Sequence, residues 1–463
     1  MTDPVVAASR PPADLDARYQ PFAPFAAWRA AAVDLDLRLV DEAASQLDDE
    51  CRTADPATVR AVRDFAVRAA AFDTGAIEGL YETDRGVTFA VATQSAAWES
   101  TVAEVSGPEA VRHFEAHLRA FELVFDAATS RSPVSAAWLR ALHETICTGQ
   151  LTYRALTAVG WQDLPLPRGE YKRMPNHVRQ PDGSWHSYAP VDQVTPEVQR
   201  LVDEVGSTDF ADAHPVLQAA YVHHALVGIH PFADGNGRVA RAAASVFLYR
   251  GMRVPLLVFV DQRLRYLAAL RAADQGGYAG FIRFVRELVI DTIELMMQAL
   301  RTARTAGAAG GLAALGGAEE PEPDQDQLHF LASRLHTAVR DELREAASEL
   351  PGDLMSVRIG PAGPAGPGGA PATDVVASSP RRPGPGVTVG TTVVVSPAPA
   401  GPWPFRVAAE AADHRATVAP MGVRFGNLYP VLTTVTLYRI RAWARQVVDA
   451  LAAELAGAPR SVS

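Results

Sequence analysis

The stretch that decides the fold is residues 229–241, I-H-P-F-A-D-G-N-G-R-V-A-R. Helical apolar spacing precedes and follows it, which predicts a tight loop between two helices. Gly235 and Gly237 let consecutive backbone N–H groups converge, and the positive N-terminal end of the following helix points at the same place. The stretch therefore predicts an anion-binding site suited to a di- or triphosphate.

The side chains of this loop supply the other groups that phosphate chemistry needs. Arg238 and Arg241 lie three residues apart on the first helical turn and can clamp phosphate oxygens. Asp234 offers a hard carboxylate to the Mg²⁺ that accompanies a nucleotide phosphate. His230 is the base of the loop that works near neutral pH, and we interpret Phe232 as an apolar peg. The plainer alternative is a turn whose His and Asp only cap helices.

These residues resemble the signature of the Fic (filamentation-induced-by-cAMP) family, H-x-F-x-[DE]-G-N-G-R-x-x-R, and every specified position is met. The resemblance covers residues 74–287. It implies a mainly α fold, a Fic-type helical bundle with a β-hairpin flap. It also implies transfer of AMP from ATP to a Tyr, Thr or Ser hydroxyl of a protein, with Mg²⁺ as cofactor and pyrophosphate as the leaving group.

The resemblance assigns a role to each residue of the loop. His230 would take the proton from the incoming hydroxyl, and Asp234 would hold Mg²⁺ between the α- and β-phosphates. Arg238 would bind the β-phosphate side and Arg241 the γ-phosphate, with Phe232 in the same nucleotide-binding set. The residues that would cradle the α- and β-phosphates are Gly235, Asn236 and Gly237. The side-chain amide of the asparagine would donate as well.

Two neighbouring segments extend the resemblance. Extended residues 171–180 and 184–188 flank a Pro-Asp-Gly turn, which predicts a β-hairpin. The family's flap has this place and clamps target backbone by strand addition; its residues here are Trp185, His186, Ser187 and Tyr188. Residues 265–274 resemble the helix that meets adenosine. Its candidate contacts are Tyr266, Leu267 and Asp274, of which the first two could equally be core, and Asp274 stands where many members have asparagine.

A second motif, residues 74–79 (T-G-A-I-E-G), fits the inhibitory signature [ST]-x-x-x-E-[GN] of Fic proteins. It lies at the end of a predicted helix that Gly79 would stop. The resemblance places Glu78 opposite Arg241, so that a charge-assisted pair would occupy the γ-phosphate position; Thr74 opens the motif. The alternative is an incidental surface glutamate.

Two histidine pairs need weighing against structural roles. His113 and His117 are spaced i,i+4 and could share a metal, but no third ligand accompanies them, so a zinc site is disfavoured. His223 and His224 precede the loop by about two turns of helix. We interpret them as packing or hydrogen-bonding groups behind it.

Composition sets the wider limits. The chain has 463 residues, 48% of them hydrophobic and 21% charged, and a formal charge of −10, which is ordinary globular composition without a bulk basic character. Nucleic acid is therefore not a predicted partner. No apolar run reaches the about 20 residues of a membrane span, no secretory signal is visible, and two distant cysteines predict no disulfide. We expect a cytoplasmic protein without a membrane partner.

The pattern along the chain predicts several parts. They are a flexible N-terminus (1–25), a helical region with the inhibitory motif (26–100), the Fic catalytic core (101–303), a linker (304–326), a helix (327–350), a flexible Gly/Pro-rich tether (351–386) and a small α+β or helical C-terminal module (387–463). The expected partner is a protein with a Tyr, Thr or Ser hydroxyl. Self-modification is expected as well, and homodimerisation is left open.

Three functions remain open at this point. The first is an auto-inhibited protein adenylyltransferase. The second is a relative that moves another nucleotide or phosphate-linked group, such as UMP or phosphocholine, or that removes AMP with Glu78 positioning water. The third is a nucleotide-sensing module without turnover, which the loss of His230 or Asp234 would favour; both are present.

Overall fold

The computed structural model describes residues 12, 14–93, 98–157, 159–180, 183–313, 325–348, 350, 356–361, 363–364, 371–378, 388–397, 405–411, 418, 421–423 and 434–457. Predicted parts that lie outside the described residues include residues 1–11, Pro181 and Asp182 of the hairpin turn, and residues 314–324 of the linker. The chain divides into two compact units, Met1–Gly316 and Gly317–Ser463.

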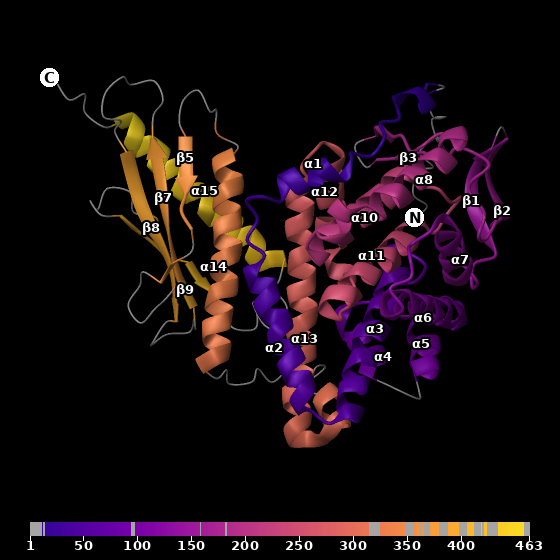
Figure 1. Ribbon diagram of the computed structural model, residues 1–463, viewed down its shortest axis with the longest axis horizontal. Coiled ribbons are helices and arrows are strands. Elements are labelled where there is room, and N and C mark those ends of the chain that lie inside the picture. Colours follow the sequence, from indigo (N-terminus) through magenta and orange to yellow (C-terminus); the bar gives the residue numbers. More distant parts are fainter. Residues whose placement is uncertain are drawn as a thin grey trace, which may run out of the picture. The chain divides into compact units, whose positions relative to one another are not determined.

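The first unit is built mainly of helices (Figure 1), which confirms the mainly α prediction. They are α1 (Phe25–Ala31), α2 (Arg38–Thr53), α3 (Pro56–Ile77), α4 (Arg85–Thr93), α5 (Trp98–Ser106), α6 (Pro108–Thr129), α7 (Ala136–Ile146), α8 (Val194–Val205), α9 (Thr208–Ala211), α10 (Pro215–Ile229), α11 (Asn236–Met252), α12 (Arg263–Asp274) and α13 (Tyr278–Ala313), with 3-10 turns at Asp16–Arg18, Val191–Gln193 and Val260–Gln262. The antiparallel neighbours α10 and α11 form the centre. Helix α13 packs on α10, and α6 packs on α11.

Helix α3 carries the inhibitory motif, and its two ends explain where that motif lies. The Asp55 side chain accepts from the backbone N–H groups of the first turn, and Pro56 follows at the first helical position, a favourable N-terminus. At the other end Gly79 takes a φ of +73°, which stops the helix. Glu78 is thus the C-terminal cap residue of α3. The inner face of α3 packs on α13 and α6.

Two hairpins interrupt the helices. The predicted one consists of β3 (Val178–Arg179) and β4 (Trp185–His186), with Val178 opposite His186. A second antiparallel hairpin, β1 (Thr152–Thr157) and β2 (Gly160–Pro165), was not predicted. Its sequence lacks an Asn-Gly or Asp-Gly turn, which is the strongest short-range signal for a hairpin.

The N-terminal segment was predicted to be flexible up to residue 25, but its described residues 14–24 are packed. Leu15 and Phe22 are buried, and the Arg200 guanidinium lies 3.5 Å from the centre of the Phe22 ring. His177 Nε2 lies 2.9 Å from Asp16 Oδ1. Composition missed this packing because two apolar anchors suffice to fix a Pro/Ala-rich segment.

The second unit is an antiparallel sheet with two helices. Its strands are β5 (Ser356–Ile359), β6 (Gly363–Pro364), β7 (Pro371–Ser378), β8 (Thr388–Pro397), β9 (Phe405–Ala411) and β10 (Met421–Val423), in the order β10-β9-β8-β7-β5, with β6 also on β7. The helices α14 (Gln325–Ser348) and α15 (Thr434–Gly457) pack on each other, and both contact β7 and β8. Buried Val375, Val393 and Val395 lie on these central strands.

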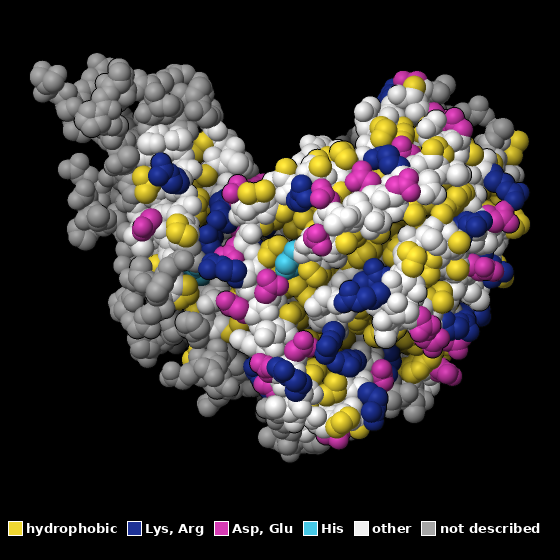
Figure 2. All heavy atoms as spheres, in the orientation of Figure 1, with side chains coloured by type: hydrophobic (Ala, Val, Ile, Leu, Met, Phe, Trp, Pro, Cys, Tyr) yellow, Lys and Arg dark blue, Asp and Glu magenta, His cyan; other side chains and the backbone are white. Residues whose placement is uncertain are grey.

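These bounds differ from the predicted domain limits. Helix α13 continues to Ala313, into the segment predicted as linker, and β5, β6 and β7 lie within the segment predicted as a flexible tether. Alternation of Val, Ala and Thr in β7 buries every second residue of its centre, whereas the surrounding Gly and Pro residues mask that signal in the composition. Within the described ranges no helix has the length and hydropathy of a membrane span. On the face drawn in Figure 2, basic and acidic side chains are interspersed.

We expect the first unit to fold by itself. A chain ending at Gly316 keeps α13 whole and cuts between the two compact units. It should unfold in one cooperative thermal transition with the circular dichroism of a helical protein. Insolubility, or a broad transition without a baseline, would show that the second unit contributes to the core.

Candidate active site

The loop between α10 and α11 is fixed by its own backbone and by Asn236. His230 ends α10 in the left-handed conformation (φ 53°, ψ 57°). The Phe232 N–H donates to Asn236 Oδ1 over 2.9 Å, and Asn236 Nδ2 donates to the Phe232 carbonyl over 2.8 Å. The amide expected to donate to phosphate is therefore engaged within the loop. Asn236 is buried, so its first task is to hold the loop closed.

The two glycines of the loop are required for different reasons. Gly235 has a φ of +80°, and a Cβ there would lie 2.7 Å from Cys147 Sγ. A Cβ on Gly237 would lie 2.3 Å from Glu78 Oε1. The carboxylate of Glu78 therefore sits directly against the backbone at the N-terminus of α11, where the helix presents its positive end.

His230 is neutral and presents a free lone pair. Its Nδ1 lies 3.2 Å from the Val227 carbonyl, which can only accept, so the proton is on Nδ1 and Nε2 is the basic atom. Burial, and next the charge of Lys172, lower the pKa of His230 to about 3. The Tyr188 ring stacks on the imidazole with a centroid distance of 3.7 Å. The base is thus deprotonated at neutral pH and is covered by the flap residue Tyr188.

His143 of α7 braces the loop from behind, and no motif in the sequence predicts this role. Its ring stacks on Phe232 with centroids 3.9 Å apart, which confirms the packing of Phe232 as an apolar peg. Nδ1 accepts from the Gly169 N–H over 2.9 Å, so Nε2 carries the proton and donates to the Asp234 carbonyl over 3.0 Å. Burial lowers the pKa of His143 to about 4, consistent with this neutral tautomer.

Gln150 links the two charged side chains of the loop and was also missed. Its Nε2 donates to Asp234 Oδ2 over 2.7 Å, and its Oε1 accepts from Arg238 Nη2 over 2.6 Å. Asp234 Oδ1 accepts from the Gly235 N–H and lies 3.8 Å from Arg238 Nη2. Both side chains are thus oriented by one buried amide, although no sequence motif connects them.

The Asp234 carboxylate fits a magnesium ion that arrives with a nucleotide. Among the residues that the structure describes, no cluster of three or more His, Cys, Asp or Glu side chains could hold a metal. The Asp234 carboxylate is 43% exposed, so it can offer an oxygen to an ion. Mg²⁺ is commonly held by one or two carboxylates together with substrate phosphates and water, and a single carboxylate satisfies that requirement.

Arg241 donates from Nε and Nη2 to residues at the end of α3. Its Nη2 lies 2.7 Å from Glu78 Oε1, and Nη2 also donates to the Thr74 carbonyl over 3.1 Å. Nε donates to Thr74 Oγ1 over 2.7 Å, which explains why a hydroxyl residue opens the motif. Burial opposes the charge, but the Glu78 carboxylate and the Tyr266 hydroxyl together outweigh it and raise the pKa of Arg241.

The residues of α12 that were expected to contact adenosine have different surroundings. Tyr266 is buried, accepts from Arg241 Nη1 over 3.3 Å and lies 3.0 Å from His223 Nε2, so it supports the arginine. Asp274 Oδ1 lies 3.0 Å from His224 Nε2, and Asp274 Oδ2 lies 3.8 Å from His186 Nδ1 of the flap. The histidine pair of α10 is therefore structural. Leu267 is partly exposed.

The flap is anchored at both sides. Ser187 Oγ donates to the Leu15 carbonyl of the N-terminal segment, while Trp185 pairs with Arg179. Lys172, the single lysine of the chain, ties the preceding segment to the loop: its N–H donates to the Pro231 carbonyl over 2.8 Å, and its Nζ donates to Asn176 Oδ1 over 2.7 Å. Burial lowers the pKa of Lys172 to about 7.

The fold and the site together define a helical domain with a glycine-containing loop at a helix N-terminus and a histidine at the mouth of that loop. Residues 133–248 match the model of the Fic/DOC family. The chain therefore contains a domain of the Fic family.

Two relatives and one solved structure are similar to parts of this chain. The protein adenylyltransferase Fic of Drosophila persimilis is 36% identical over 100 residues, which is 22% of this chain and 20% of that protein. The one of Drosophila willistoni is 33% identical over 133 residues, 29% of this chain and 26% of that protein. The chain thus matches about a quarter or less of these relatives' length. A solved Fic-domain-containing signaling protein from Bacteroides thetaiotaomicron is 20% identical, with a TM-score of 0.46, over 57% of this chain and 97% of that one.

We expect the protein to lose stability as the pH falls from 7 to 5. The pKa values of His143 and His230 are about 4 and 3, and burial lowers those of His117 and His223 well below the ordinary value. Below about pH 6.5 the unfolded chain binds these protons and the folded chain does not, which costs about 1.4 kcal/mol per pH unit for each net proton.

One buried carboxyl acts in the opposite direction, because burial raises the pKa of Asp73 to about 7. The four histidines outnumber it, so thermal melting at a series of pH values should give a lower transition temperature at pH 5 than at pH 7. His143→Asn should show a smaller pH dependence than the wild type. A transition temperature that is constant or rises on acidification would contradict the neutral tautomers.

Proposed function

We propose that this protein is an auto-inhibited protein adenylyltransferase that transfers AMP from ATP to a Tyr, Thr or Ser hydroxyl of a protein and releases pyrophosphate. The observation that carries the proposal is the loop between α10 and α11, which begins at His230, continues into the helix N-terminus at Gly235–Gly237 and is followed by Arg241 beside that backbone. The Drosophila relatives carry the name protein adenylyltransferase Fic. The activity, its substrates and its partners are proposed for this chain.

Each residue of the loop has a place in this reaction. The neutral Nε2 of His230 would take the proton of the attacking hydroxyl as that oxygen bonds to the α-phosphorus. The N–H groups at the N-terminus of α11 would stabilise charge on the phosphate oxygens. Asp234 would hold Mg²⁺, which neutralises charge on the phosphates when it is bound. The bond from the α-phosphorus to its bridging oxygen breaks, and pyrophosphate leaves.

The inhibited state follows from the arginine. Arg241 is the cation that would bind the γ-phosphate, but Glu78 and Thr74 occupy its donors. A γ-phosphate that cannot reach Arg241 leaves the triphosphate displaced along the loop. Because a misplacement of about 1 Å can cost on the order of 100-fold in rate, inhibition does not require loss of ATP binding.

The flap would also orient the base. Tyr188 is buried and stacks on the face of the His230 imidazole, so it would fix the ring plane in which Nε2 meets an incoming hydroxyl. The edge of the β3–β4 hairpin would then bind the extended backbone of the target. The protein substrate, and the chain itself as one substrate, would be held in this way.

The catalytic base is tested first. His230→Ala should abolish transfer of label from α-labelled ATP while the affinity for MgATP, measured by calorimetry, changes less than about threefold, because the base acts on the target hydroxyl. Near-wild-type transfer by this variant, in the Glu78→Gly background, would contradict the assignment.

The metal ligand is tested by Asp234→Ala and by the matched Asp234→Asn. Both should weaken MgATP binding and transfer together, whereas binding of ATP in EDTA should be unaffected. Equal affinity of wild type and both variants for MgATP would remove Asp234 from the metal site. If the variants lost the same amount of ATP affinity with Mg²⁺ and in EDTA, the substitution would have distorted the loop instead of removing a metal ligand.

Auto-inhibition is tested by Glu78→Gly, which should raise AMP transfer, including self-modification, by tenfold or more. Glu78→Gln keeps the side-chain volume and removes the charge, so it should activate partly. Glu78→Gly/Arg241→Ala should lose the gain. Parallel reactions with UTP, GTP and CTP, followed by intact mass, identify the transferred group. Equal labelling by wild type and Glu78→Gly would contradict auto-inhibition, and an adduct other than AMP would redirect the proposed activity.

A further inference from the structure

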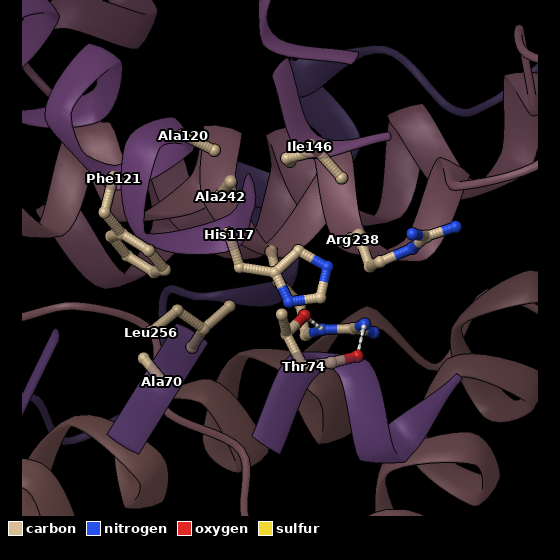
Figure 3. A pocket seen from close by; sticks show the side chains of 10 residues that line it. Ala70, Thr74, His117, Ala120, Phe121, Ile146, Arg238, Ala242 and Leu256 are labelled. Carbon is tan, nitrogen blue, oxygen red and sulfur yellow. Dashed lines mark hydrogen bonds between the residues drawn. The ribbon is translucent and has the colours of Figure 1, made fainter. Parts of the chain in front are cut away.

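A small cavity lies behind the phosphate loop, among α3, α6, α7 and α11 (Figure 3). All of the side chains that line it are buried. Its volume, measured as the space open to the centre of a water molecule, is about 10 Å³, which is about the lower limit for holding one water. The lining is largely apolar, with Phe121 and Ile146 among its members, but it includes His117 and Arg238.

His117 offers an acceptor to this cavity. Its Nδ1 lies 2.9 Å from the Ala71 carbonyl. Because a carbonyl only accepts, the ring proton is on Nδ1 and Nε2 carries a lone pair. Nε2 is buried, and no hydrogen-bond partner for it exists in the described part of the chain. In Figure 3 this nitrogen is turned toward Arg238.

Arg238 offers donors on the other side. Its Nη2 donates to Gln150, but Nε and Nη1 are buried and have no acceptor among the residues described. The side chain is 1% exposed, so bulk solvent does not satisfy these groups. Buried polar atoms are almost always hydrogen-bonded, to protein or to ordered water.

We propose that this cavity binds one water molecule, which accepts a hydrogen bond from the Arg238 guanidinium and donates one to His117 Nε2. Arg238, with two buried unpartnered donors, and His117, with one buried acceptor, line a space of the right size, and water is the small molecule that both donates and accepts. His117 then acts through this water as a positioning residue for Arg238.

Other occupants fit less well. A halide ion can accept from Arg238, but it cannot donate to the lone pair of His117 Nε2. A metal ion could bind that lone pair, but it would meet the positive charge of Arg238. A role of His117 toward Arg238 is therefore a better explanation of this histidine than a zinc site shared with His113.

The consequence for activity rests on the proposed function, in which Arg238 binds the β-phosphate side. Gln150 fixes one end of the guanidinium, and the water fixes the Nε and Nη1 side, so the plane of the group is set before a nucleotide arrives. Without the water, the Arg238 guanidinium would lose a hydrogen bond and its fixed orientation. A misplaced Arg238 would then lower the rate of nucleotide transfer.

The water itself is tested by a crystal structure of the full chain at about 1.5 Å resolution or better, with a second crystal soaked in sodium bromide. A density peak within about 3.2 Å of both His117 Nε2 and an Arg238 nitrogen, without anomalous bromide signal, is expected. Anomalous signal at the peak, or direct contact of His117 Nε2 with Arg238 and no peak, would overturn the site.

The positioning role is tested in the Glu78→Gly background. His117→Phe removes the acceptor and should lower kcat/KM for ATP by about tenfold, whereas His117→Gln, whose amide oxygen can accept from the water, should stay within about twofold of the parent. Phe121→Leu, which alters the same cavity without a polar group, should not change kcat/KM. Equal losses in His117→Phe and His117→Gln would overturn the role. If the Glu78→Gly parent transfers no nucleotide, the proposed function fails, and the crystal still decides the water site.

Discussion

The buried charge of Arg241 is the constraint on which the site depends. A guanidinium that is 4% exposed needs acceptors on every side, and the fold supplies them from separate elements. Thr74 and Glu78 come from the end of α3, and Tyr266 comes from α12. Tyr266 in turn meets His223 of α10. Four helices are thus fastened at one arginine, and the same atoms would be released if a γ-phosphate replaced Glu78.

This arrangement makes residues 74–79 a structural element, and under the proposed function they would be a switch as well. Buried ion pairs contribute little net stability, yet removal of one partner is costly because it leaves an uncompensated charge. Arg241 keeps its bonds to Thr74 and Tyr266 when Glu78 is removed, which softens that cost. Under the proposed function, an active state with Glu78 displaced would therefore be reachable, whereas one without Arg241 would not.

Around this pair, a layer of hydrogen-bonding groups holds the loop in place. Asn236 closes it from within, His143 and Gln150 brace it from behind, and Lys172 ties it to the segment before the flap. Such second-layer contacts fix the groups that would touch the nucleotide and so reduce reorganisation during reaction. They also explain why the loop tolerates two residues in left-handed conformation, His230 and Gly235.

The sequence predicted the parts of the site that are local in the chain. Residues 229–241 and 74–79 carry their spacing with them, so both motifs could be found without a structure. Their facing each other was inferred from family resemblance, and the Glu78–Arg241 pair supports it. Gln150 and His143 could not be found, because their roles arise only when α7 folds against the loop.

In the second unit, strands β5 to β7 were hidden by Gly and Pro on either side of short alternating segments. The buried N-terminal residues 14–24 escaped prediction for a similar reason, since only Leu15 and Phe22 anchor them. Composition describes a segment's average tendency, whereas a few apolar contacts at fixed places decide whether it is ordered.

The most direct test of the central claim is a pair of crystal structures, wild type and Glu78→Gly, each with a non-hydrolysable ATP analogue and Mg²⁺. The account predicts that Arg241 keeps its contact with Glu78 in the wild type and binds the γ-phosphate in the variant, with the α-phosphate shifted toward His230. An Arg241 that binds the γ-phosphate in both structures, or in neither, would contradict it.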